Sequence, residues 1–327
     1  MSAPILKVRD LRVQFQVPVR GGLFRRYQGL RALDGISFDL AAGETLGIVG
    51  ESGCGKSTLG RAVLQLIAPT SGSVLWMGQE IAGLDSGAMR PRRGEMQIVF
   101  QDPLASLDPR MTVGEIIGEP LRAQRRGISR DELRAEVSAI LAKVGLSPQM
   151  VNRYPHEFSG GQCQRIGVAR AMILKPRLIV CDEPVSALDV SIQGQIINLL
   201  MQLQAEFGMA MIFISHNLAV VRHISKRILV LYLGRAMEIA DRDALYGNPL
   251  HPYTRALISA VPIPDPELES GKRRLRLSGE LPSPLSPPSG CVFRTRCPLA
   301  EDRCARETPE LEDTGDGRQV ACHRWRE

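Results

Sequence analysis

One eight-residue pattern constrains the local fold of this chain more than any other feature. Residues 50–57 have the sequence G-E-S-G-C-G-K-S, which matches the phosphate-binding pattern G-x-x-x-x-G-K-[ST] at every position. The apolar segment 45–49 before it predicts a buried strand, and residues 57–67 after it predict a helix. Because a strand, a glycine turn and a helix form the context in which this pattern binds phosphates, a purely structural glycine turn is the weaker interpretation.

The pattern predicts a socket for the β- and γ-phosphates of a nucleotide. Glycines allow successive backbone N–H groups to face one concavity, the helix start adds partial positive charge, and Lys56 adds a full charge. We expect the Ser57 hydroxyl to bind Mg²⁺. The candidate ATP-binding residues of this segment are Gly50, Glu51, Ser52, Gly53, Cys54, Gly55, Lys56, Ser57 and Thr58.

Two carboxylates follow a second apolar segment. Residues 178–183 read L-I-V-C-D-E, which predicts a central parallel strand buried on both faces. Ligands of doubly wound sheets bind beyond the carboxyl ends of such strands, so Asp182 and Glu183 should emerge beside the phosphate loop. Asp182 then suits Mg²⁺ binding, and Glu183 suits the polarisation of an attacking water.

Two further polar residues follow predicted strands. Gln101 comes after the segment 97–100, and a neutral amide there can contact both Mg²⁺ and the attacking water. His216 comes after the segment 211–215, where its imidazole can donate to a γ-phosphate. Taken singly, either residue is more often an ordinary surface side chain. Their positions at strand ends favour the functional interpretation.

A second anion-binding helix start is predicted at residues 158–162, which read F-S-G-G-Q and open a helix that extends to Leu174. Ser159 is a suitable N-cap, and the glycines after it expose backbone N–H groups. The chain thus has two phosphate-binding devices but one lysine-bearing loop. Either both act on one nucleotide within the chain, or they are shared between two chains.

The order of these motifs resembles that of the ATP-binding subunits of ABC transporters over about residues 4–262. The resemblance rests on the phosphate loop, Gln101, the signature S-G-G-Q, the Asp182-Glu183 pair, the turn S-A-L-D at 186–189, and His216. It implies an α/β fold: a P-loop NTPase cassette with a RecA-like core, an antiparallel β subdomain and a helical subdomain at about 103–175. It also implies a head-to-tail dimer that binds ATP between the phosphate loop of one subunit and the signature of the other. The signature residues that would act in trans are Ser159, Gly160, Gly161 and Gln162.

The resemblance further implies hydrolysis of ATP to ADP and phosphate, with a role for each motif. Ser57, Gln101 and Asp182 would hold Mg²⁺, Glu183 would be the general base, and His216 and Gln101 would position the water and the γ-phosphate. Asp189 would couple the two sites of the dimer. Phe15 matches the adenine-stacking aromatic, with Phe24 and Tyr27 as alternatives, and Cys163 replaces the arginine that usually follows the signature.

Two segments resemble one branch of this family, the dipeptide and oligopeptide importers. Residues 251–257, H-P-Y-T-R-A-L, are similar to a motif after the cassette, and residues 17–24 are similar to an insertion in the second of the two ATPase subunits. The implied function is to power import of dipeptides, oligopeptides or related small solutes. The implied partners are a homologous second ATPase in a heterodimer, two membrane permeases and an extracytoplasmic solute-binding protein, with no nucleic acid. The chain would lie peripherally on the cytoplasmic face of the membrane.

The C-terminal part predicts a linker at residues 263–290, rich in proline, serine and charge, and a cysteine-rich extension at 291–327. Cys291, Cys297, Cys304 and Cys322 are four of the seven cysteines of the chain. In a cytosolic protein such crowding favours a metal over disulfides, and the spacing suits either zinc or an iron–sulfur cluster. Resemblance to the importers implies a 4Fe-4S cluster.

The other three cysteines are interpreted as structural. Cys54 lies at a helix start, a position that lowers thiol pKa, but it is better explained as a small residue in a tight loop. Cys163 and Cys181 are interpreted as packing residues.

The composition of the chain and its motif content argue against several other functional classes of protein. No stretch of the 327 residues is long and apolar enough for a membrane helix, and the 5% aromatic content is too low for a base-stacking platform, despite a net charge of +6. The main alternative is a non-transport ABC-type ATPase that acts on nucleic acid or ribosomes. It is disfavoured because the chain has one cassette and no long coiled-coil insertion. A small-molecule kinase would leave the second anion-binding helix unexplained.

Overall fold

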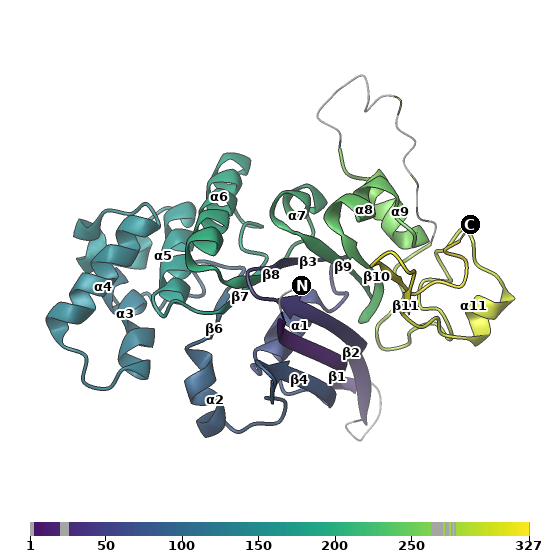
Figure 1. Cartoon of the computed structure of the whole chain (residues 1–327), viewed down its shortest axis with the longest axis horizontal. Coiled ribbons are helices and arrows are strands. Elements are labelled where there is room, and N and C mark those ends of the chain that lie inside the picture. Colours follow the sequence, from purple (N-terminus) through teal and green to yellow (C-terminus); the bar gives the residue numbers. More distant parts are fainter. Residues whose placement is uncertain are drawn as a thin grey trace. The chain divides into compact units, whose positions relative to one another are not determined.

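The computed structural model describes residues 3–19, 26–262, 271, 275, 277 and 279–326 (Figure 1). The chain forms two compact units. The helical unit comprises Leu40–Thr45 and Leu84–Ser215 together with the first residues of the chain, and the phosphate-loop unit comprises Ile5–Asp39, Leu46–Gly83 and His216–Glu327. Both units draw on segments far apart in the sequence.

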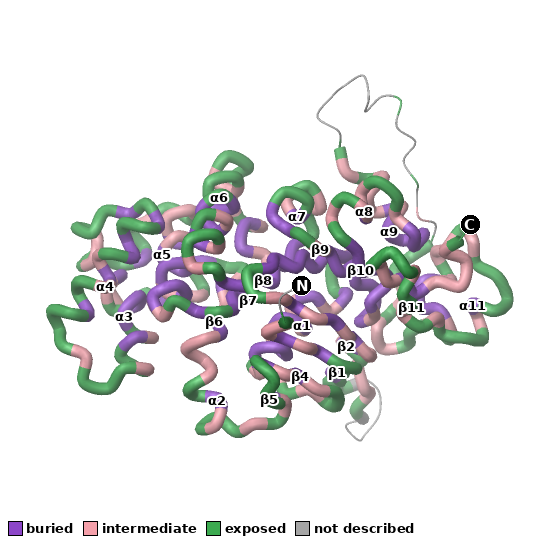
Figure 2. The backbone as a smooth tube through the Cα atoms, in the orientation of Figure 1, coloured by how far each residue is buried: buried purple, intermediate pink, exposed green. Residues whose placement is uncertain are grey.

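Three parallel strands form the sheet of the helical unit. They are β6 (Met96–Val99), β7 (Leu178–Asp182) and β8 (Ala210–Ile214), and β7 pairs with both of the others. All five residues of β7 and of β8 are buried, the class that Figure 2 colours purple. The prediction of a central parallel strand that ends at the acidic pair is therefore confirmed.

The helices of this unit begin at residues suited to capping. Thr112 and Ser129 accept backbone N–H groups at the starts of α3 and α4, and Asp85 does so for α2. The apolar side chains of α4 lie on one face and are buried: Leu133, Val137, Ile140 and Leu141. The helices are α2 (Ser86–Arg93), α3 (Val113–Gln124), α4 (Arg130–Lys143), α5 (Gly160–Met172) and α6 (Val190–Phe207), with 3-10 turns at Pro148–Asn152 and Pro155–Glu157.

The phosphate-loop unit contains two groups of strands. One sheet has the order β2-β1-β4-β5, from β1 (Pro4–Val19), β2 (Arg26–Ala41), β4 (Ser71–Trp76) and β5 (Gln79–Glu80). In the other group, β3 (Thr45–Val49) is parallel to β9 (Arg227–Tyr232), which is antiparallel to β10 (Arg235–Asp241). The helices are α1 (Lys56–Val63), α7 (Leu218–Ile224), α8 (Arg242–Gly247), α9 (Pro252–Ser259) and α11 (Asp302–Arg306).

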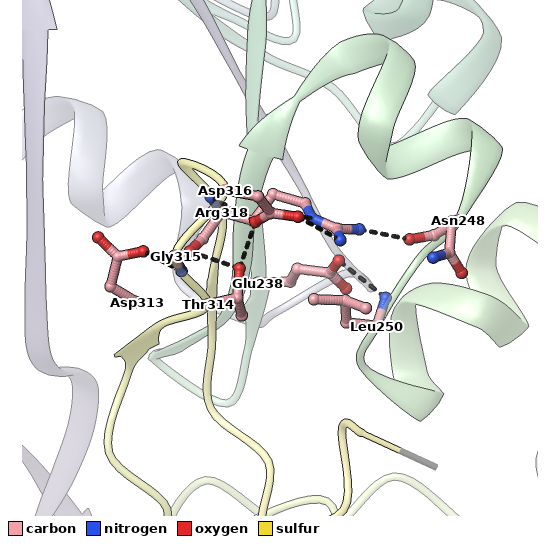
Figure 3. Close-up of polar contacts among 8 residues, drawn as sticks. All are labelled: Glu238, Asn248, Leu250, Asp313, Thr314, Gly315, Asp316 and Arg318. Atoms are coloured by element: carbon pink, nitrogen blue, oxygen red, sulfur yellow. Dashed lines mark hydrogen bonds and ion pairs between the residues drawn. The ribbon is translucent and has the colours of Figure 1, made fainter.

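The C-terminal residues extend this second group of strands. Strand β12 (Gln319–Val320) pairs antiparallel with β10 and with β11 (Glu312–Asp313). Figure 3 shows the polar contacts that hold the hairpin, in which the Arg318 guanidinium donates to the Asn248 carbonyl at 3.0 Å and pairs with Asp316. On β10 itself, the buried Glu238 carboxylate accepts the N–H groups of Leu250 and His251 at 2.9 Å.

Some predictions fall on residues outside the described ranges. These are Phe24 and residues 20–24 of the segment 17–24, and residues 263–270, 272–274, 276 and 278 of the predicted linker. In the described part of the chain, no helix has the length and apolar character needed to cross a membrane.

Candidate functional site

The phosphate loop has the geometry that its sequence predicts. Strand β3 is buried throughout, α1 begins at Lys56, and Gly50, Gly53 and Gly55 all have positive φ. A Cβ on Gly50 would lie 2.1 Å from the Leu231 carbonyl oxygen, and one on Gly55 would lie 2.4 Å from that of Ala32. Glycine is therefore required at both ends of the turn, because the loop is pressed against the end of β9 and against β2.

Lys56 points back into this turn. Its Nζ donates to the carbonyl oxygens of Gly50 at 2.9 Å and Glu51 at 3.0 Å, and the residue is 5% exposed. Ser57 and Thr58 follow in the first turn of α1 and are half-buried. The loop thus combines a lysine, a helix start at Lys56 and the exposed residues Ser52 and Gly53, the combination typical of a phosphate-binding loop.

Cys54 agrees with the preferred interpretation of a small residue in a tight loop. The residue is 3% exposed, and burial raises the pKa of its thiol above the ordinary value even though the nearby Lys56 charge acts in the opposite direction. The helix start does not make this cysteine acidic. Cys163 and Cys181 are fully buried, and burial raises the pKa of both thiols, as expected for packing residues.

In the helical unit, the structure brings Gln101, Asp182 and Glu183 together. Asp182 is the last residue of β7 and is 1% exposed. Glu183 has a φ of 47°, a left-handed conformation that costs a non-glycine residue energy. Its N–H donates to the Ile214 carbonyl at 3.0 Å, and its Oε2 accepts the Gln101 Nε2 amide at 3.2 Å.

The segment 159–162 begins helix α5 as predicted, although the helix ends at Met172 and not at Leu174. The Ser159 hydroxyl accepts the Gln162 N–H at 3.4 Å, and the Gln162 side chain accepts the Ser159 N–H at 3.0 Å, which is a capping box. A Cβ on Gly161 would lie 2.6 Å from Ile192 Cγ2, so glycine allows α5 to approach α6. Ser159 and Gly160 are exposed.

The turn after Glu183 ends at Asp189, which precedes α6 and is exposed. The next residue, Val190, is 84% exposed, the highest value among the large apolar side chains of the described chain. The turn is held by N–H groups of Ser186 and Leu188 that donate to the carbonyls of Glu183 and Val185 at 3.2 Å. An ordered turn therefore presents an acidic and an apolar side chain to solvent.

Three other candidate residues belong to the phosphate-loop unit. His216 lies two residues after the end of β8 and is exposed. Phe15 on β1 is 38% exposed and Tyr27 on β2 is 58% exposed, so either ring is accessible for stacking.

The four C-terminal cysteines are free thiols in the structure, so the disulfide alternative is not realised. The Cys291 N–H donates to the Cys304 carbonyl at 2.8 Å. Burial raises the pKa of Cys291 to about 11, and the neighbouring thiols of Cys304, Cys297 and Cys322 add to the effect. Within the described residues, however, no three Cys, His, Asp or Glu side chains are placed to hold a single metal ion.

Two residues at the phosphate loop were not assigned to it from the sequence. The Tyr253 hydroxyl accepts the Glu51 N–H at 2.9 Å, and Arg296 Nη1 lies 2.6 Å from Glu51 Oε2. Arg296 is one of several arginines near the cysteines, and Tyr253 lies within the motif H-P-Y. No local sequence signal links either residue to a loop some 200 or more positions earlier.

Comparison with known proteins gives two family matches. Residues 33–186 match the model of the family described as ABC transporter, and residues 237–304 match the model described as oligopeptide/dipeptide transporter, C-terminal region. The second match contains the motif H-P-Y and three of the four C-terminal cysteines.

Curated relatives match almost the whole chain. The oligopeptide transport ATP-binding protein OppF of Escherichia coli is 59% identical over 309 residues, covering 94% of this chain and 92% of that protein. The protein of the same name from Haemophilus influenzae is 54% identical, covering 97% and 96%. Oligopeptide transport ATP-binding protein AppF of Bacillus subtilis is 53% identical, covering 98% and 97%.

Solved structures match the cassette part. The ATP-binding cassette MJ0796, in a dimeric post-hydrolysis state bound to ADP and Pi, has a TM-score of 0.63 and 29% identity, covering 72% of this chain and 98% of that chain. The cbiO1 protein of Clostridium perfringens, part of the ABC transporter complex cbiONQ, has a TM-score of 0.64 and 27% identity, covering 75% and 91%.

Proposed function

The chain belongs to the ATP-binding proteins of ABC transporters, in the oligopeptide transport branch, and from this premise we propose how it powers peptide import. It is an ATPase that converts ATP and water to ADP and phosphate. The observation that carries the proposal is the strained Glu183 beyond a buried parallel strand, with its carboxylate bonded to Gln101. The relatives described above are named for oligopeptide transport, which favours import over an ATPase that acts on nucleic acid or ribosomes.

In the mechanism that we propose, the protein supplies position and charge for phosphoryl transfer to water. The loop amides and Lys56 bind the phosphates, and Glu183 takes a proton from the attacking water. Gln101 and His216 orient the water and the γ-phosphate. Bound Mg²⁺ would neutralise charge on the phosphate oxygens. Its protein ligands would be Ser57, Gln101 and the carboxylate of Asp182, whose burial at a strand end suits a metal ion.

The signature helix acts, in this proposal, on the nucleotide of a second subunit. Ser159 and Gly160 are exposed at the start of α5, so their hydroxyl and N–H groups are accessible to a partner. Asp189 and Val190 are also exposed, and they would contact the partner and couple the two sites. The partner is a homologous second ATPase, and Phe15 stacks on the adenine.

ABC importer subunits of this kind work with permeases and a solute-binding protein. We propose that this chain contacts two permeases from the cytoplasmic face of the membrane, as a peripheral subunit. The domain boundaries that accompany this function are a cassette at 4–262 with a helical subdomain at 103–175, a linker at 263–290 and a cysteine-bearing region at 291–327.

The four C-terminal cysteines are proposed to hold a 4Fe-4S cluster. They are free thiols, and burial followed by the neighbouring thiols of Cys304, Cys297 and Cys322 raises the pKa of Cys291. A single zinc ion needs its sulfurs about 2.3 Å from one point, whereas a cluster binds each thiolate through a different iron atom. Within the described residues no three such side chains are placed to hold one metal ion, so the proposal rests on the resemblance of this region to the importer family and on its four free thiols. A bound cluster would stabilise the C-terminal fold, because metal binding free energy contributes to folding.

The function is tested with the purified complex in proteoliposomes. We expect peptide uptake that requires ATP and is lost with the substitution Glu183→Gln. ATPase activity without peptide uptake, together with copurifying nucleic acid, would favour the non-transport alternative instead.

The cluster is tested separately, by iron and acid-labile sulfide analysis after anaerobic purification. The expected content is about four iron atoms per chain in the wild type and in the control Cys163→Ala, and a loss in Cys297→Ser. Zinc without iron, or neither metal, would contradict the cluster.

A further inference from the structure

The segment that carries the first three C-terminal cysteines contacts the phosphate loop directly. Arg296 Nη1 lies 2.6 Å from Glu51 Oε2 and 3.5 Å from the Tyr232 hydroxyl. The Arg296 side chain is 10% exposed and that of Glu51 is 26% exposed. The pair therefore joins the cysteine-bearing region to the phosphate loop.

Glu51 is held from three directions. Its carboxylate contacts Arg296, its N–H donates to the Tyr253 hydroxyl at 2.9 Å, and its carbonyl accepts Lys56 Nζ at 3.0 Å. Lys56, the proposed phosphate-binding lysine, is therefore hydrogen-bonded to Glu51, the residue with which Arg296 of the C-terminal region forms an ion pair. A change in the position of Glu51 would move both the loop backbone and the lysine.

An aromatic cluster supports these contacts. Phe293 is fully buried, and its ring centroid lies 5.3 Å from that of Tyr232, 5.3 Å from that of Tyr253 and 5.6 Å from that of His251. The His251 imidazole caps α9 by accepting the Tyr253 N–H at 3.0 Å, which fixes the tyrosine. The Arg296 guanidinium carbon lies 5.9 Å from the Tyr232 centroid, within cation–π range.

We propose that Arg296 is a positioning residue of the ATP site, which acts through Glu51 to hold the phosphate loop in its binding conformation. The inference rests on the proposed ATPase function and deepens it. It assigns to the C-terminal region a part in nucleotide binding, although that region lies outside the match at residues 33–186 to the ABC transporter family. It also explains the tyrosine of the motif H-P-Y, which bonds the backbone of the same loop residue.

The physical basis is preorganisation. Loop amides and a lysine bind phosphate tightly only when they already face the ligand, because reorganisation on binding reduces affinity. A charged, largely buried pair between Arg296 and Glu51 restricts the loop without contacting the phosphates. Loss of the pair should therefore weaken nucleotide binding more than it slows the chemical step.

The experiment compares full-length chains that carry Arg296→Gln, Arg296→Lys, Glu51→Gln and the double substitution Arg296→Gln/Glu51→Gln. Arg294→Gln is the matched control, because Arg294 donates to Ser289 within its own segment. For each chain, the dissociation constant of MgATP, KM and kcat for ATP and the thermal unfolding midpoint are measured.

The expected result is a 5- to 50-fold loss of MgATP affinity and a similar rise in KM for Arg296→Gln, with a smaller change in kcat, as is typical of coupling between sites. Glu51→Gln should show a similar loss, the double variant no further loss, and Arg296→Lys partial recovery. Affinity within twofold of wild type, an equal loss in Arg294→Gln, or additive losses in the double variant would overturn the proposal. A lowered unfolding midpoint with unchanged affinity would also overturn it. If the wild type itself does not hydrolyse ATP, the proposed function fails instead.

Discussion

The close approach of α5 to α6 at Gly161 makes a quantitative prediction for the substitution Gly161→Ala. The added Cβ would lie 2.6 Å from Ile192 Cγ2, whereas carbon atoms in contact prefer about 3.5–4.0 Å, so the helices must separate by roughly 1 Å. Such overpacking costs about 1–3 kcal/mol of unfolding free energy. In the same helix, a Cβ on Gly167 would meet nothing within 4 Å.

Gly167→Ala is therefore the matched control, and it should stabilise the chain by about 0.5–1 kcal/mol because alanine restricts the unfolded backbone more than glycine does. The two variants should thus differ by about 1.5–4 kcal/mol. The assay is urea unfolding of the full-length chain followed by far-ultraviolet circular dichroism, with ATP turnover measured in parallel. Equal midpoints for the two variants, or a destabilised Gly167→Ala, would refute the packing explanation.

Two further predictions concern catalysis and pH. Glu183→Gln should keep MgATP affinity and lower kcat by about 10²–10⁴-fold, because a positioned general base is lost; near-normal turnover in single-turnover kinetics would contradict the assignment. Burial lowers the pKa of His251 to about 3, below its value of about 6.5 in an unfolded chain, so its contribution to stability is complete above about pH 6.5 and is lost as pH falls toward 3. The matched control is His251→Asn, which keeps a capping side chain but cannot titrate. Between pH 7 and pH 5 the wild type should lose about 2 kcal/mol more unfolding free energy than this variant. Equal losses for the two chains in urea titrations would count against the prediction.

The elements that carry the site could be predicted because each motif is local. The turn at 50–57 needs glycine conformations that only its own residues supply, and the run 178–181 is apolar throughout because both faces of this central strand are buried. The capping box at Ser159 is likewise formed by residues three apart. Local predictions of strand and helix type therefore agree with the structure to within a few residues at each end.

Two local properties depend on the tertiary environment. Burial outweighs the effect of the nearby Lys56 charge and raises the pKa of the Cys54 thiol, which agrees with a small residue that fills a tight loop. The strain at Glu183 was not predicted, because the φ of 47° results from the contacts of its backbone beyond β7. Both properties depend on how much of the surrounding chain covers the residue.

By itself, the sequence indicated an ATP-binding chain and predicted the residues of its site, since those predictions follow from spacings of a few residues. Only the tertiary structure decided that Arg296 meets Glu51 and that Tyr253 meets the same residue, across 245 and 202 positions of sequence. The physical reason is that a buried polar side chain needs a hydrogen-bond or ion-pair partner, but its residue type does not specify which residue that partner is. The partner is chosen by the strands and helices that pack around both residues.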